Sequence, residues 1–213
     1  MWVHRSGEFY QERPVVIYEY QKDRDHQKPL EFYRDYKGIL VTDGLQQYHL
    51  VDKKLPDVTN ANCWAHARRD FADAVKAMDK KAPSVVRESI AYQALQKIAE
   101  FYNADTELKG LPCEERLQKR QEKIRPLVEE FFAWVKEQAA RCVVPPKSKT
   151  GQGLQYLIHQ EPYLKVFLTD GDVPIDNSAS ERAIRTFCIG KKNWQMIDTI
   201  HGAKSSAIIY SIV

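Results

Sequence analysis

The chain has 213 residues, of which 43% are hydrophobic and 11% aromatic, so it can bury a core and is not disordered throughout. Its formal net charge of +3 does not indicate a nucleic-acid-binding protein from composition alone, and any basic surface must therefore be local. No apolar run is long enough to span a bilayer, and we expect neither a secretory leader nor a membrane partner.

The first part of the chain alternates between strand and helix patterns, with β-branched and aromatic residues in the strands and Pro29 placed to open the first helix. Strands are predicted over residues 1–6, 15–20 and 38–44, helices over residues 30–36 and 45–51, and a strand that runs into a helix over residues 61–78. This order of elements is typical of an α/β fold.

Most of the chain from Ala65 to His159 is helical in pattern. Apolar residues recur every three or four positions over residues 84–102 and 113–143, and Pro126 marks a break or kink. A linker and two short helices are predicted over residues 143–153, 154–160 and 162–168. This block carries many charges but no cluster of catalytic type, so we interpret it as a helical insertion.

The last part of the chain begins with a loop over residues 169–179. The stretch SERAIRTFCI predicts a helix over residues 180–189, with Gly190 as its C-cap. The basic stretch over residues 191–197 is expected to be extended, and a final helix begins at residue 201.

Four cysteines lie far apart in the sequence, at positions 63, 113, 142 and 188. None forms a CxxC pair, which disfavours both a zinc site and a disulfide framework. Cys63 and His66 have a CxxH spacing, but no second pair completes a zinc site. We therefore expect free thiols in a reducing cytoplasm.

Asp43 follows the apolar stretch GILVT and precedes Gly44. The end of a strand in an α/β sheet is where side chains leave the packed layer, so an acid there suits a metal ligand. A plain Asp-Gly turn explains the same residues, and the spacing alone favours the turn.

Glu181 also has two interpretations. The stretch Ser178-Ala179-Ser180-Glu181 matches a capping box, in which the glutamate bonds back to the start of its own helix. From Arg182 to Lys204, however, there are five basic residues and one acid. A single carboxylate at the edge of a basic stretch is what a metal-dependent enzyme acting on phosphodiesters needs, although a charge run is more often only a solvated surface.

The stretch CWAHARR offers His66 to orient a phosphate or a carboxylate, and Arg68 and Arg69 to contact a DNA backbone. A helix start with Cys63 and Trp64 packed in the core is the simpler explanation. Trp194, after GKKN, could stack on a base, but such a tryptophan is more often half-buried.

Taken in order, the segments MWVHRSG, VVIYEY, LVTDG, CWAHARRDF, PIDNSASERAIR, GKKNW and AIIYSIV resemble the core of the insertion sequence 66 transposases, which are DDE enzymes with a ribonuclease H-like fold. The resemblance runs from end to end and is weakest over residues 80–145. It implies a mixed sheet flanked by helices and interrupted by an all-α insertion. The implied ranges are residues 1–75 and 166–213 for the core and residues 76–165 for the insertion.

The resemblance implies two Asp and one Glu that bind Mg²⁺ or Mn²⁺. Asp43 matches the second Asp, Glu181 the Glu, and His66 a position near the active site. The DNA-contacting residues that it implies are Arg68, Arg69, Arg182, Arg185, Lys191, Lys192 and Trp194. The implied partners are transposon ends and target DNA, with a homo-oligomer in the complete protein and a location in the bacterial cytoplasm at the nucleoid.

The family's first Asp lies one strand before the segment MWVHRSG, and no matching strand occurs here. We therefore expect a truncated copy whose isolated chain neither cleaves nor joins DNA efficiently, and whose sheet exposes an edge that lowers solubility. Two alternatives stay open. One is a non-catalytic remnant that binds DNA or dimerises, and the other is a helical interaction module.

Overall fold

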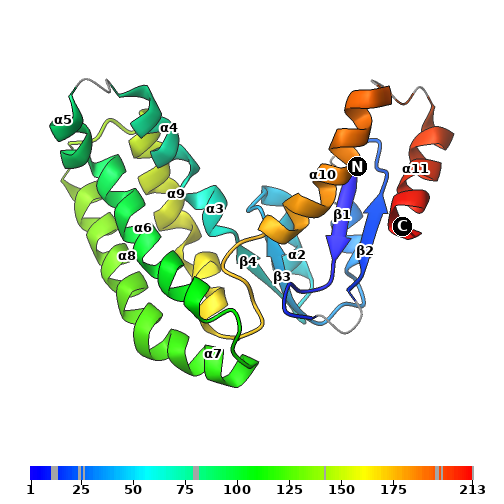
Figure 1. The fold of residues 1–213 in the computed structure, drawn as a ribbon, viewed down its shortest axis with the longest axis horizontal. Coiled ribbons are helices and arrows are strands. Elements are labelled where there is room, and N and C mark those ends of the chain that lie inside the picture. The colour runs from blue at the N-terminus through cyan, green and yellow to red at the C-terminus, as the bar shows by residue number, and fades with distance from the viewer. Residues whose placement is uncertain are drawn as a thin grey trace.

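The computed structural model describes residues 1–10, 14–23, 25, 27–78, 82–141, 143–194, 197 and 199–212. Figure 1 shows two lobes that diverge in a V, one built from the helices of the middle of the chain and the other from the strands and both chain ends. None of the described helices has both the length and the apolar composition needed to cross a membrane.

The described strands form two separate pairs rather than one sheet. They are β1 (Trp2–Arg5), β2 (Val16–Glu19), β3 (Gly38–Thr42) and β4 (Val58–Asn62). β1 and β2 are antiparallel, with Val3 opposite Tyr18, whereas β3 and β4 are parallel, with Leu40 opposite Asn60. The predicted strands are confirmed, and both strand directions occur, but the ribonuclease H-like assignment stays a prediction.

Helices make up most of the described chain. Those beside the strands are α1 (Gln27–Phe32), α2 (Gln46–Lys54), α3 (Trp64–Ala67), α10 (Ser178–Trp194) and α11 (Ile200–Ile212). Those of the helical lobe are α4 (Arg69–Ala77), α5 (Pro83–Glu88), α6 (Ile90–Glu107), α7 (Cys113–Lys119), the π-helix η1 (Arg120–Ile124), α8 (Arg125–Ala140), α9 (Lys149–Leu164) and the 3₁₀-helix η2 (Val166–Leu168). Helix α4 packs on α6 and α9 of the helical lobe. The predicted boundary between core and insertion, after residue 75, falls inside this helix, and it stays a prediction.

Three local predictions were wrong. The predicted helix boundary at residue 161 is absent, because α9 begins at Lys149, inside the predicted linker, and continues to Leu164, and Pro162 lies in its last turn, where a missing N–H removes only one bond. Residues 166–168 form the separate 3₁₀-helix η2. Gly190 is not a C-cap and residues 191–194 are not extended, since α10 continues to Trp194 and a helical glycine costs only about 1 kcal/mol. The first helix begins at Gln27 rather than after Pro29.

The predicted break at Pro126 takes the form of a widened turn. The π-helix η1 lies between α7 and α8 and ends two residues before the proline, which is the second residue of α8. A π-turn leaves room for a ring that has no N–H and would otherwise collide with the preceding turn.

Two hydrophobic clusters stabilise the described fold. The larger one joins the helical lobe to β4 and includes Trp64, which is fully buried against Phe101 and Phe131. The smaller one lies between β2, α10 and α11, around Tyr18 and Phe187. No residue belongs to both clusters, so the two strand pairs are anchored in different cores.

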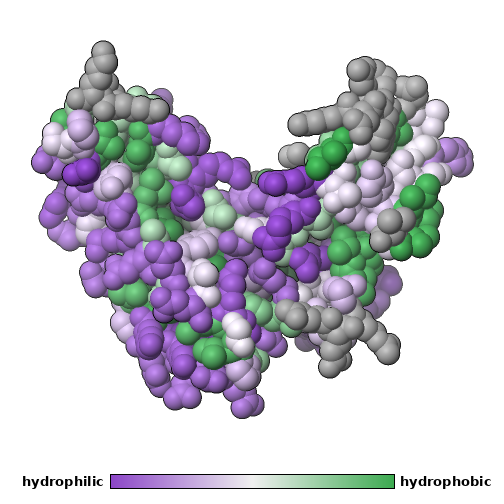
Figure 2. Space-filling view, viewed as in Figure 1, coloured by the Kyte–Doolittle hydropathy of each residue, from purple (hydrophilic) through white to green (hydrophobic). Residues whose placement is uncertain are grey.

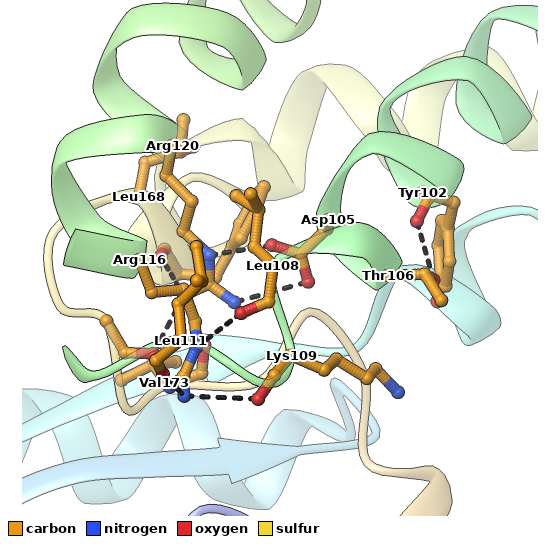
Figure 3. Close-up of polar contacts among 12 residues, drawn as sticks. Tyr102, Asp105, Thr106, Leu108, Lys109, Leu111, Arg116, Arg120, Leu168 and Val173 are labelled. Carbon is orange, nitrogen blue, oxygen red and sulfur yellow. Dashed lines mark hydrogen bonds and ion pairs between the residues drawn. The ribbon is translucent and has the colours of Figure 1, made fainter.

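The loop between η2 and α10 is fixed by two buried arginines of the helical lobe, which are drawn in Figure 3. Arg120 is fully buried, pairs with Asp105 at 2.7 Å and donates to the carbonyls of Phe167 and Val173. Arg116 donates to the carbonyl of Gly171 at 2.7 Å. These bonds hold the chain that leads into the N-terminus of α10, where Glu181 lies.

Candidate active site and family

Asp43 lies directly after β3, at the edge of a cavity. Its Oδ1 accepts a hydrogen bond from the backbone N–H of Leu45 at 3.1 Å, so the Asp-Gly turn predicted as the simpler interpretation is present. The carboxylate also lines the cavity together with Glu181, which is far away in sequence. The turn and a role as a ligand are therefore compatible.

Gly44 is required at the next position for two reasons. Its φ of +80° lies in the left-handed region, which disfavours any side chain. A Cβ at this position would also lie 2.5 Å from the hydroxyl oxygen of Tyr156 on α9. Glycine thus allows the end of β3 to lie against the helical lobe.

A buried chain of polar side chains lies beneath this turn. The hydroxyl of Thr42 donates to Asn60 at 3.0 Å, Asn60 donates to Asn62 at 3.0 Å, and Asn62 donates to Gln160 of α9 at 2.8 Å. Because buried amides cost free energy unless they are paired, this chain fixes β3, β4 and α9 relative to one another. Asp43 is consequently held on a rigid support.

His66, in α3, lies beside Glu181, which is far from it in sequence. The distance between His66 Nε2 and Glu181 Oε1 is 3.3 Å. Burial lowers the pKa of His66, nearby Arg69 lowers it further, and the carboxylates of Glu181 and Asp43 oppose the shift. The imidazole is therefore neutral at pH 7. When its proton is on Nε2, that N–H donates a hydrogen bond to the Glu181 carboxylate. Its Nδ1 is then an acceptor, and that atom is buried without a hydrogen-bond partner among the residues that the structure describes.

The predicted capping box is wrong. The backbone N–H groups of Ser180 and Glu181 donate to the carbonyl of Asn177, so Asn177 rather than Ser178 precedes the helix. Glu181 is consequently the fourth residue of α10, and its carboxylate reaches His66 instead of the start of its own helix. The Ser-x-x-Glu spacing misled because Asp176 also takes part, accepting from the N–H of Ser178 at 2.8 Å.

Asp176 is a residue that sequence reasoning missed. It lines the same cavity as Asp43 and Glu181, and its charge also acts on the pKa of His66. Its Oδ2 accepts a hydrogen bond from the hydroxyl of Tyr102 on α6 at 3.0 Å, which helps to raise the pKa of Tyr102 after burial. Its position directly before Asn177 was visible, but the tyrosine that fixes it is distant in sequence.

The structure places the predicted DNA-contacting arginines around this site. Arg68, between α3 and α4, and Arg69, the first residue of α4, are exposed, and the charge of Arg69 acts on His66. Arg182 and Arg185 are exposed on α10, where Arg182 pairs with Glu8 at 3.0 Å. Figure 2 shows a hydrophilic surface at the start of α10 and in the notch between the two lobes. The side chains of Lys191, Lys192 and Trp194 lie outside the described residues, as does Cys142.

A second acidic group occurs at Cys113, Asp170 and Asp172, whose ligand atoms lie within 4.8 Å of one another. Asp170 Oδ1 already accepts from the N–H of Asp172, and Asp172 pairs with Arg116 at 3.3 Å. A guanidinium thus supplies the positive charge that a metal would bring. This group consequently stabilises the loop before α10.

Comparisons with known proteins agree with the motifs. A family model described as "Transposase IS66 family" matches residues 1–205. The chain is similar to the uncharacterized proteins y4hP and y4qI of Sinorhizobium fredii (strain NBRC 101917 / NGR234), at 31% and 29% identity over 94% of the chain. It spans only 37% and 36% of the length of these relatives. No solved structure matches. Because the family match covers nearly all of the sequence, the chain belongs to the IS66 family of transposases.

Proposed function

We propose that the chain is part of the catalytic core of a DNA transposase, which cleaves DNA and transfers strands with the help of divalent metal ions. The observation that carries the proposal is that Asp43 and Glu181, from two distant segments, line one cavity, and that His66 from a third segment contacts Glu181. Membership of a transposase family makes DNA the expected substrate.

The residues present fit a hard divalent ion such as Mg²⁺ or Mn²⁺. Asp43 and Glu181 supply carboxylate oxygens, the ligands that these ions prefer. The Oδ1 of Asn177, which also lines the cavity, is a buried oxygen without a partner among the described residues. When bound, the ions would activate a water or a 3′-hydroxyl and stabilise charge at phosphorus. We propose Asp43 and Glu181 as the two ligands that this chain provides.

The protein's own groups position these ligands. The Asp43 carboxylate is restrained by its bond from the Leu45 N–H, and the Glu181 carboxylate by the His66 imidazole. A neutral His66 adds no positive charge, so it does not compete with a cation for Glu181. Arg68, Arg69 and Arg185 are proposed to contact phosphates, whereas Arg182 is partly neutralised by Glu8.

Binding of Mn²⁺ tests the proposal more directly than turnover, because two carboxylates alone are not expected to support efficient cleavage. We expect the 213-residue chain to bind Mn²⁺ weakly in a calorimetric titration or by electron paramagnetic resonance. Asp43→Asn and Glu181→Gln should each weaken that binding by at least about tenfold, since each removes one charged ligand. Asp35→Asn, at an exposed acid that pairs with Arg34, is the matched control and should change nothing.

Equal Mn²⁺ affinity in all four proteins would contradict the proposed site. If the chain then still bound DNA with an affinity that falls steeply with salt and is unchanged by a chelator, the non-catalytic DNA-binding alternative would be supported instead.

A further inference from the structure

The residues that lead into α10 are bonded to the start of α3. The backbone N–H of Trp64 donates to the carbonyl of Ile175 at 3.2 Å. The backbone N–H of Asn177 donates to the sulfur of Cys63 at 3.4 Å. Because Trp64 opens α3 and Asn177 directly precedes α10, the first turns of these two helices are held side by side.

Asp176, between the two bonded residues of this loop, is held by the helical lobe. Its Oδ2 accepts a hydrogen bond from the hydroxyl of Tyr102 on α6 at 3.0 Å, and its Oδ1 accepts one from the backbone N–H of Ser178 at 2.8 Å. Burial and the charge of Asp176 raise the pKa of Tyr102, so the hydroxyl keeps its proton and is the donor of this bond. One carboxylate thus connects a helix of the helical lobe to the first residue of α10.

Tyr102 belongs to a face of α6 that fixes the same loop at a second point. Asp105, three residues further along the helix, pairs with Arg120, which donates to the carbonyl of Val173 (Figure 3). Residues three apart lie on the same face of a helix. Helix α6 therefore supports the loop at Val173 and again at Asp176, immediately before α10.

The helical lobe also holds the segment that carries the other carboxylate. Gln160 of α9 accepts from Asn62 at 2.8 Å, and the buried polar chain continues through β4 to Thr42, directly before Asp43. Helices α6 and α9 both pack on α4 and α8, so the two supports belong to one packed set of helices. The helical lobe consequently sets the separation between Asp43 and Glu181, which line one cavity.

We propose that Tyr102 is a positioning residue of the carboxylate site. Its hydroxyl holds Asp176, Asp176 holds the first turn of α10, and that turn presents Glu181 to the cation that it shares with Asp43. This role rests on the function proposed above, and it gives the helical lobe a direct part in assembling the site. Both oxygens of Asp176 already accept hydrogen bonds, so Asp176 supports the ligands instead of acting as one.

A third ligand is the alternative role for Asp176, because its carboxylate lines the same cavity. The two roles predict opposite effects when the Tyr102 hydroxyl is removed. A supporting carboxylate loses its anchor, and the site then binds a cation less tightly. A ligand carboxylate is released from a competing donor, and the site then binds a cation more tightly.

Tyr102→Phe removes the hydroxyl and keeps the ring against the larger hydrophobic cluster. We expect this change to weaken Mn²⁺ binding by about tenfold in a calorimetric titration, the usual order of effect for a group that orients a metal ligand. Without metal, it should also speed hydrogen exchange at the amide of Ser178, whose acceptor is no longer fixed. Tyr92→Phe, at a half-buried tyrosine nearer the start of the same helix, is the matched control and should change neither quantity.

A merely structural role for Tyr102 gives a different result. Urea denaturation is measured in parallel, and Mn²⁺ is titrated under conditions in which each variant is folded. Tyr102→Phe could lower the urea midpoint and leave the Mn²⁺ affinity unchanged, while Asp43→Asn and Glu181→Gln weaken it. That outcome overturns the positioning role and leaves the proposed metal site standing.

Three further results are equally decisive. Tighter Mn²⁺ binding by Tyr102→Phe, or a much larger loss of affinity in Asp176→Asn than in Tyr102→Phe, would make Asp176 a ligand and overturn the proposal. Unchanged exchange at the Ser178 amide in Tyr102→Phe would overturn it as well, because the hydroxyl would then not hold the start of α10. If neither Asp43→Asn nor Glu181→Gln changes the affinity, the proposed function fails and the positioning role fails with it.

Discussion

At the scale of single residues, Gly44 determines how closely the end of β3 approaches α9. Gly44→Ala should lower the free energy of unfolding by more than about 1 kcal/mol, because it combines an unfavourable φ of +80° with a Cβ 2.5 Å from the Tyr156 hydroxyl. Urea denaturation followed by circular dichroism measures this change. Gly110→Ala is the control, since a Cβ there meets nothing within 4 Å.

The contact and the backbone contributions can be separated. Within the described part of the chain the buried Tyr156 hydroxyl has no hydrogen-bond partner, so Tyr156→Phe should cost little by itself and should relieve the collision in the double variant. Partial recovery is expected, because the strained φ remains. A double variant as unstable as Gly44→Ala would show that the collision is not the source of the loss.

At the scale of elements, the loop before α10 depends on η1. Arg120→Met should lower stability by about 3–5 kcal/mol, because it leaves the carboxylate of Asp105 buried without a charge partner and frees several carbonyls of the loop. Arg125→Met, at an exposed position of α8, should change stability by less than about 0.5 kcal/mol. Chemical denaturation of the two variants measures the difference.

The ion pair between Arg120 and Asp105 need not itself stabilise the protein. Adding Asp105→Leu to Arg120→Met removes the uncompensated charge, and much of the lost stability should return. If the double variant stays as unstable as the single one, the loop carbonyls rather than the ion pair account for the cost.

The elements that the sequence predicted well are those set by local patterns. The strands around Val3, Tyr18 and Leu40 follow from alternation and β-branching, and the helical middle follows from its apolar period. Pro162 and Gly190 misled, because neighbouring turns tolerate them inside long helices. Local rules overestimate how often these residues end a helix.

The candidate site was predictable only through the resemblance to a family. Nothing local in the sequence brings His66 to Glu181, because the two residues belong to helices α3 and α10, which are far apart in the chain. Asp176 was missed since its partner, Tyr102, belongs to another helix. The burial of Arg120 was likewise hidden in a stretch that is otherwise typical of a charged, solvated helix.

At the scale of the whole molecule, the stability of the fold should fall in mildly acidic solution. The pKa values of His4, His49 and His66 all lie below the ordinary value of 6.5, and burial is the largest cause in each case. Well above pH 6.5 these groups are neutral in both states, so stability is independent of their titration. Below it the unfolded chain takes up protons first, and stability falls until pH passes the folded pKa values.

Melting temperatures measured between pH 8 and pH 5 should therefore be level at first and then decline, because the free energy of unfolding falls by at most about 1.4 kcal/mol per pH unit for each proton taken up. His4 is the most buried of the three, stacked on Phe32 and bonded to Tyr33, so His4→Gln should reduce the decline even though it lowers the melting temperature at pH 8. Because the effect of protonation is lost with the imidazole, the curves of the two proteins should converge as the pH falls. Parallel curves would instead assign the acid sensitivity to groups other than His4.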